Sequence, residues 1–130
     1  MSEHYGFGCR VAAPMQETIE RTTAALKEQG FGVLTTIDVQ QTLKTKIGVD
    51  FQPYVILGAC NPHYAIQVIG IDPYMSTMLP CNVTLRQLPD GRHEVAAIDP
   101  AAAMGAVGNV AMEPLAIEVR EALKRVVDTL

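Results

Sequence analysis

The sequence predicts an α+β fold, in which a mainly antiparallel sheet carries two long helices on one face. Several short segments alternate apolar and polar residues with the period of a half-buried strand, and two longer stretches place their apolar residues on one helical face. The turn Pro89-Asp90-Gly91 joins two strand segments into a predicted hairpin. The predicted order is strand, helix, four strands, helix, with short helical insertions between strands two, three and four.

The N-terminal part supplies the first strand and the first long helix. Residues 5–11 carry apolar side chains at alternate positions, as a strand with one buried face does. Pro14 suits the first turn of a helix, where its missing N–H is not needed, and Gly30 supplies a C-terminal stop. The face expected to pack on the sheet consists of Met15, Ile19, Thr22 and Leu26.

The middle of the chain alternates strands with short helices. Residues 31–37 are predicted as the second strand, after which Asp38 caps a short helix that Gly48 ends. Residues 54–59 form the third strand because they are an apolar run of strand length. Asn61-Pro62 then combines a helix N-cap with a proline at the first helical position, so a helix should follow.

The C-terminal part is predicted to complete the sheet and add the second long helix. After the helix ends near Gly70, Asp72-Pro73 is expected to make a turn, and residues 81–88 and 92–98 form the hairpin. Asp99-Pro100 closes the sheet, and an Ala/Gly-rich connection over 101–108 leads to the last helix. One side of that helix carries Leu115, Val119, Ala122 and Val126.

Composition bounds the functional class. The 130 residues suit one domain, 1–130, and a formal net charge of -4 without a basic cluster predicts neither nucleic acid nor an anionic membrane as a partner. Polar residues interrupt the most apolar region, so no membrane-spanning segment is expected. Three cysteines cannot form a complete set of intramolecular disulfides, and no signal peptide is recognised, so we expect a cytoplasmic protein with reduced thiols.

A Cys-Asn pair occurs twice in a segment that is almost free of charge. Cys60-Asn61 and Cys81-Asn82 both lie where the chain should change direction, and Asp72 is the only formally charged residue between Phe51 and Leu85. Such a segment must be packed, paired with another subunit or arranged around a ligand, because exposed apolar surface is costly in water. We therefore expect a homodimer that buries part of it, the alternative being that the loop from Tyr74 to Leu79 folds over its own sheet.

The chain resembles the domain of unknown function 302 family of bacteria and archaea. The resemblance rests on Val49-Asp50-Phe51, the run from Tyr54 to Pro62, Ala65, the segment Leu79-Pro80-Cys81-Asn82-Val83 and the closing Asp99-Pro100. It implies an α+β fold like that of the TATA-binding-protein class, with a curved antiparallel sheet backed by helices, and often a homodimer. It implies no established reaction, and no role is carried over to Cys9 or His63.

The two family-type cysteines have a reactive and a structural interpretation. Cys60 precedes a helix N-cap, where the helix dipole and free N–H groups favour a thiolate, but cysteine is also among the most buried residue types. Cys60, Cys81 and His63 would suit a soft metal, haem iron included, although their spacing is too loose for a zinc motif. Asn61 is expected to cap the helix and Asn82 to bond backbone groups near Pro80.

These patterns favour a small homodimeric binding module over an enzyme. Its apolar pocket would lie between the two Cys-Asn motifs and take a small molecule, a metal or a cofactor of unknown identity. The alternative is a thiol-dependent redox protein or enzyme that uses Cys60 and Cys81, for which only His63 is available as a base. Either reading expects the two thiols to lie close together. The candidate ligand-binding residues are Cys60, Asn61, His63, Leu79, Cys81 and Asn82.

Overall fold

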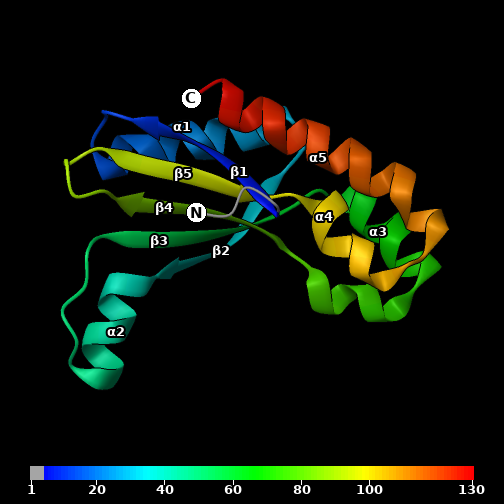
Figure 1. Ribbon diagram of the computed structural model, residues 1–130, viewed down its shortest axis with the longest axis horizontal. Coiled ribbons are helices and arrows are strands. Elements are labelled where there is room, and N and C mark those ends of the chain that lie inside the picture. The colour runs from blue at the N-terminus through cyan, green and yellow to red at the C-terminus, as the bar shows by residue number, and fades with distance from the viewer. Residues whose placement is uncertain (1–4) are drawn as a thin grey trace.

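The computed structural model describes residues 5–130 and places a five-stranded antiparallel sheet at its centre (Figure 1). The strand order is β1-β5-β4-β3-β2, and each neighbouring pair is antiparallel. This confirms the predicted antiparallel sheet. The strands are β1 (Gly6–Val11), β2 (Gly32–Asp38), β3 (Tyr54–Cys60), β4 (Cys81–Gln87) and β5 (His93–Ile98).

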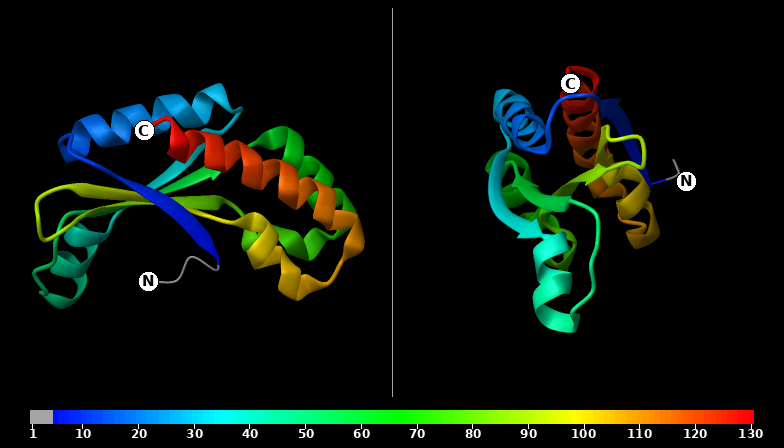
Figure 2. Two further views of the ribbon diagram at one scale, coloured as in Figure 1. Left: turned by 45° about the horizontal axis from the view of Figure 1, so that its top comes forward. Right: turned by 90° about the vertical axis from the view of Figure 1, so that its left-hand side faces the viewer.

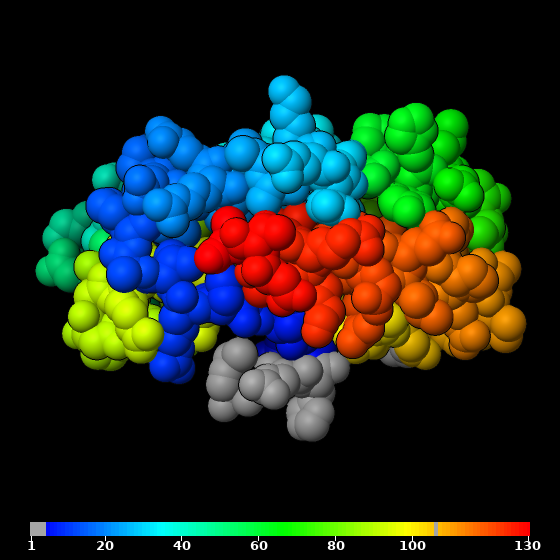
Figure 3. All heavy atoms as spheres, turned by 90° about the horizontal axis from the view of Figure 1, so that it is seen from above, coloured from blue at the N-terminus to red at the C-terminus, as the bar shows by residue number. Residues whose placement is uncertain are grey.

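Two long helices, α1 (Met15–Glu28) and α5 (Glu113–Asp128), cover one face of the sheet. Figure 2 shows both on the same side of the strands, and Figure 3 shows them side by side when the molecule is seen from above. The predicted placement of both helices is therefore confirmed. Within residues 5–130, no helix is long and apolar enough to cross a membrane.

The main core lies between this helical layer and the sheet. Alternate residues of the strands point into it, so Leu57, Val83, Leu85 and Val95 are at most 1% exposed. From the helices, Leu26 and Leu123 are fully buried against them, along with smaller residues. Full burial of a side chain of this size stabilises the fold by about 1.5–3 kcal/mol, so this layer sets which face of the sheet stays open.

Helix α2 (Val39–Ile47) stands apart from the core. The Asp38 carboxylate accepts a hydrogen bond from the Gln41 N–H at 2.9 Å, and Gly48 ends the helix with a φ of 67°, both as predicted. None of its side chains is buried. In Figures 1 and 2, α2 projects on the side of the sheet opposite to α1 and α5.

The remaining helices form a second, smaller layer beyond the ends of the strands. Helix α3 (Pro62–Ile71) follows the Asn61 cap and leads into the 3-10 helix η1 (Pro73–Met78). Helix α4 (Pro100–Met104) is followed by two more 3-10 turns, η2 (Gly105–Val107) and η3 (Val110–Met112). These segments share a small apolar cluster of Val68, Met75 and Met112.

Two of these helical segments correct the sequence-based expectation. The predicted turn at 72–73 begins η1 instead, because the Asp72 carboxylate accepts a hydrogen bond from the Tyr74 N–H at 3.0 Å. The connection expected over 101–108 is helical for the same reason. There the Asp99 carboxylate accepts the Ala101 N–H at 3.0 Å, and alanine is the strongest helix former.

Candidate functional site

The face of the sheet opposite to α1 and α5 is open, and the strand register fixes which side chains it presents. Residues that lie directly opposite one another on neighbouring strands share a face. One cross-strand row contains Arg10, Glu94, Arg86 and Tyr54. The next row contains Gly8, Ala96, Thr84, Ile56 and Ile37. A third row includes Asn82, Gly58 and Thr35.

A cavity of about 530 Å³ lies over this face, and we call it the open-face cavity. Its residues come from three separate parts of the chain: the start of β1, the segment from Phe51 to Tyr54 and the β4–β5 hairpin. The lining includes Phe51, Tyr54, Asn82, Thr84, Arg86 and Glu94.

Two glycines on this face are required by the close approach of neighbouring atoms. A Cβ atom on Gly8 would lie 2.6 Å from the Val95 carbonyl oxygen, so this position of β1 accepts only glycine at this strand spacing. A Cβ on Gly58 would lie 2.8 Å from Cγ of Pro80 and would also collide with the Thr35 hydroxyl. Gly58 therefore lets the turn before β4 pack directly on β3.

Two aromatic rings form a wall of the cavity. The ring centroids of Phe51 and Tyr54 are 6.1 Å apart with an interplanar angle of 31°. Helix α2 holds the segment that carries Phe51, because the Gln40 side-chain amide donates to the Phe51 carbonyl at 2.8 Å. The Lys44 ammonium also pairs with Asp50 at 2.8 Å. The outlying helix is thus tied to the rim of the cavity.

One ion pair lies on the cavity lining. Arg86 donates from Nε to the Glu94 carboxylate at 2.9 Å, and the side chains are 34% and 14% exposed. Arg10 is the residue opposite Glu94 on the neighbouring strand β1. Among the described residues that line the cavity, one guanidinium is therefore paired with one carboxylate.

The first Cys-Asn motif has the geometry expected of a helix start. The Asn61 side-chain oxygen accepts the His63 N–H at 3.1 Å, and its amide lies 3.5 Å from the Gln29 carbonyl at the end of α1. A Cβ on Gly30 would come within 2.9 Å of that amide, and the φ of Gly30 is 83°. Asn61 thus ties the start of α3 to the turn after α1.

Both family-type thiols line one small cavity. Cys60, Asn61, Leu79 and Cys81 are among the residues around this space of about 20 Å³, which we call the thiol cavity. That volume is close to the space for a single water molecule. Burial, together with the nearby Cys60, raises the pKa of the Cys81 thiol to about 11. Cys81 is therefore a neutral thiol at physiological pH.

The other two predicted site residues lie elsewhere. His63 is exposed on α3 and does not line the thiol cavity, whereas Asn82 is exposed on the open face and lines the open-face cavity. Within residues 5–130, no group of three or more His, Cys, Asp or Glu side chains is placed to hold a metal ion. Cys60, Cys81 and His63 of one chain accordingly form no three-ligand site. Burial raises the pKa of the Cys9 thiol, with Asp128 and Glu94 adding to the effect.

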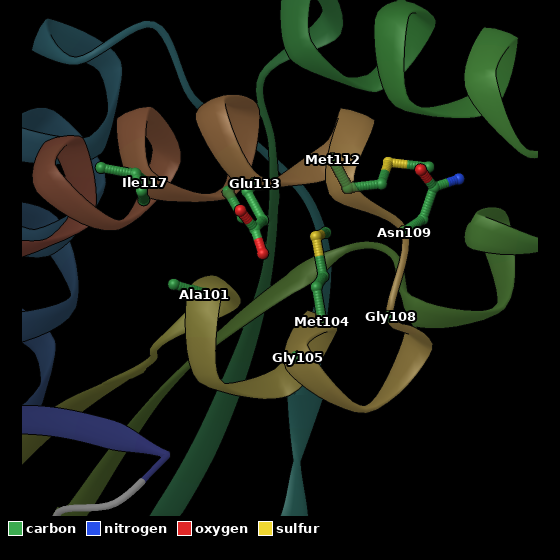
Figure 4. A pocket seen from close by; sticks show the side chains of 9 residues that line it. Ala101, Met104, Gly105, Gly108, Asn109, Met112, Glu113 and Ile117 are labelled. Atoms are coloured by element: carbon green, nitrogen blue, oxygen red, sulfur yellow. The ribbon is translucent and has the colours of Figure 1, made fainter.

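A third cavity, of about 240 Å³, lies between α4 and the start of α5 (Figure 4). Met104 and Met112 line it, together with the polar side chains of Asn109 and Glu113. The Asn109 side chain is already committed, because its oxygen accepts the Ala111 N–H at 3.0 Å. This cavity therefore offers mainly apolar contacts and one carboxylate.

Sequence reasoning did not single out Phe51, Tyr54, Arg86 or Glu94. The sequence of the hairpin does contain a relevant pattern. Thr84, Arg86 and Glu94 are the polar positions of an alternation whose apolar positions are buried, so they mark the face that stays open. Which of these side chains lie next to each other depends on the register between strands, however, and the sequence pattern of one strand does not give that register.

A family model described as a domain of unknown function, DUF302, matches residues 7–130. The chain belongs to the DUF302 family. Among solved structures, this DUF302 protein is similar to the crystal structure of an uncharacterized conserved DUF302 protein from Bacillus stearothermophilus. The two share 32% sequence identity and a TM-score of 0.88 over 95% of each chain. Comparison with curated proteins gives no match.

Proposed function

We propose that this DUF302 protein is a small-molecule-binding module that acts as a homodimer, with the open-face cavity as its ligand site. The observation that carries the proposal is the cavity itself. Its volume of about 530 Å³ suits a small organic molecule, and its lining combines aromatic side chains with a few polar ones. The thiol cavity, at about 20 Å³, has no room for such a ligand.

The proposed site keeps a link to the second Cys-Asn motif. Asn82 follows Cys81 on β4, and the two side chains point to opposite faces of the sheet because strand residues alternate. Cys81 is packed in the core, while the Asn82 amide lines the open-face cavity. In this proposal Cys81 anchors the strand in the core and the Asn82 amide contacts the ligand.

A substitution that fills the cavity tests the site. We expect Thr84→Trp, at the centre of the open face, to weaken binding of the neutral fluorescent probe N-phenylnaphthylamine at least tenfold. The matched control is Thr36→Trp, because Thr36 is an exposed strand residue outside the cavity lining. Probe titrations of both variants and of the original protein give the comparison. Equal affinities in all three would reject the open-face cavity as the ligand site.

The homodimer is supported by exposed apolar side chains on α3 and η1. Ile66 is 74% exposed and Tyr74 is 83% exposed, although neighbouring Met75 is buried at 2% within the chain. We call this patch the α3–η1 surface, and it consists of Ile66, Ile69, Ile71, Tyr74 and Met78. Several large apolar side chains exposed on neighbouring elements are typical of subunit contacts.

The alternative thiol-dependent function has weaker support. Cys60 and Cys81 line the same space, which suits a redox pair, but the pKa of about 11 keeps Cys81 protonated at neutral pH. A thiolate is the reactive form in both nucleophilic attack and disulfide exchange. The exposed position of His63 away from the thiol cavity also leaves the thiols without an adjacent base.

A further inference from the structure

The charges around the open-face cavity are gathered at one end. Within the described lining, Arg86 and Glu94 are the only charged residues, and both belong to the open-face row that lies nearest the β4–β5 turn. Arg10 extends this row and lines an adjoining cavity of about 460 Å³ together with Glu94. The rest of the lining is aromatic, aliphatic or neutral. The cavity thus has one end that carries an ion pair and an uncharged body.

The Arg86 guanidinium is only partly used by the protein. Its Nε donates to Glu94, while among the described residues its two terminal nitrogens, Nη1 and Nη2, have no hydrogen-bond partner. Glu94 is the more buried member of the pair, so it holds the guanidinium plane in place on the sheet. A guanidinium fixed in this way presents paired donors that match the two oxygens of a carboxylate.

We infer that the ligand is an amphipathic organic anion, a flat ring system with one carboxylate-like group, whose anionic group binds the free nitrogens of Arg86. The inference rests on the proposed open-face site and adds the ligand's chemical class. Arg10, opposite Glu94 on β1, adds a second positive charge to this row outside the cavity lining. Phe51 and Tyr54 contact the ring system, which explains why an aromatic wall adjoins the ion pair.

The strand geometry also limits the ligand's length. Arg86 and Asn82 are four residues apart on β4 and point to the same face. At about 3.3 Å per residue, their side chains start roughly 13 Å apart. A molecule of two linked or fused rings fits that span, with its anion at Arg86 and a polar group near the Asn82 amide.

Two related fluorescent probes test this inference. Anilinonaphthalene sulfonate carries an anionic group, and N-phenylnaphthylamine has the same ring system without it. We expect Arg86→Gln to weaken binding of the sulfonate about tenfold or more, because a charge-assisted contact is lost, and to change binding of the neutral probe less than twofold. Arg92→Gln is the matched control, since Arg92 pairs with Asp90 outside the cavity lining and both affinities should stay unchanged.

Glu94→Gln separates recognition from a merely structural role of the ion pair. If Arg86 binds the anion, removing the competing carboxylate should strengthen sulfonate binding a few fold, opposite in sign to Arg86→Gln. If the pair only stabilises the sheet, both variants should impair both probes alike, and that result would overturn the inference. If Thr84→Trp leaves the affinities of both probes unchanged, the inference and the proposed function both fail. If Thr84→Trp weakens only the neutral probe, or Arg86→Gln weakens both probes equally, the inference alone fails.

Discussion

Gly58 lies at the contact of β2, β3 and the turn before β4. Thr35 and Pro80 both approach its Cα so closely that a methyl group has no space, and the Pro80 contact involves a stiff ring. The missing side chain lets the turn before β4 pack on β3 beside Asn82. The glycine is therefore required for packing between segments that are distant in the sequence.

Gly58→Ala should lower the free energy of unfolding by about 1–3 kcal/mol, because the added Cβ must displace Pro80 or Thr35. Gly32→Ala is the matched control, since a Cβ on this strand glycine would meet nothing within 4 Å. Urea unfolding of the two variants measures the difference. Equal stability of both variants would show that the close packing at Gly58 is not present in solution.

The buried thiol of Cys81 gives a prediction on pH. Its pKa is raised from 9.0 to about 11 in the folded chain. Its contribution to stability is therefore fully present below pH 9.0 and is lost as the pH rises toward 11. Over this window the original protein should lose about 2–3 kcal/mol more than Cys81→Ala does. Urea unfolding at the two pH values measures this loss, and parallel profiles would contradict the burial of the thiol.

At the scale of elements, α2 shows how a helix without a buried side chain can serve a site. The sequence predicts both of its ends. Asp38 accepts a free N–H group at the helix start, and Gly48 adopts the left-handed backbone conformation that ends the helix. Its contacts with residues 50 and 51 could not be predicted from the sequence, because they join side chains of the helix to the loop that follows it. The helix orders the loop that carries Phe51.

Asp38→Ala removes the cap and should loosen α2, at a cost of about 1 kcal/mol to the helix. Phe51 then loses its support, so N-phenylnaphthylamine should bind several fold more weakly while the core remains folded. Asp72→Ala is the control, because it removes an equivalent cap from η1, far from the cavity lining. A probe affinity that is unaffected by Asp38→Ala, or equally affected by both variants, would refute the role of α2.

The two Asp-Pro pairs show why some elements were missed. Asp72-Pro73 and Asp99-Pro100 both suggest a turn, yet in each case the aspartate accepts N–H groups of a following helical segment. Asn61-Pro62 likewise begins a helix, α3, and there the sequence predicts it. Local signals thus predicted most helix starts, while the choice between a turn and a helix depended on packing against the Val68 cluster.

At the scale of the whole molecule, periodicity predicted that both long helices cover one face of the sheet, and that face is apolar at alternate positions of β4 and β5. The candidate site was harder to predict. Cys60 and Cys81 did come together, as expected from their places at strand ends, but the space between them is small. The larger cavity depends on cross-strand neighbours, which no single segment reveals.

The homodimer also belongs to this scale. We expect sedimentation of the protein at tens of micromolar to give a dimer, and Ile66→Glu on the α3–η1 surface to give a monomer, because a buried unpaired charge is costly. Leu34→Glu is the control, since Leu34 is 67% exposed on the edge strand β2. If the dimer persists in Ile66→Glu and dissociates in Leu34→Glu, the interface lies at β2 and not at the α3–η1 surface.

The most direct test of ligand binding on the open face is a crystal structure of the protein with anilinonaphthalene sulfonate bound. We predict that the probe's rings lie against Phe51 and Tyr54, with the sulfonate within hydrogen-bond distance of Arg86. Electron density for the probe in the cavity beside Met104 and Met112, with the open face left empty, would contradict it.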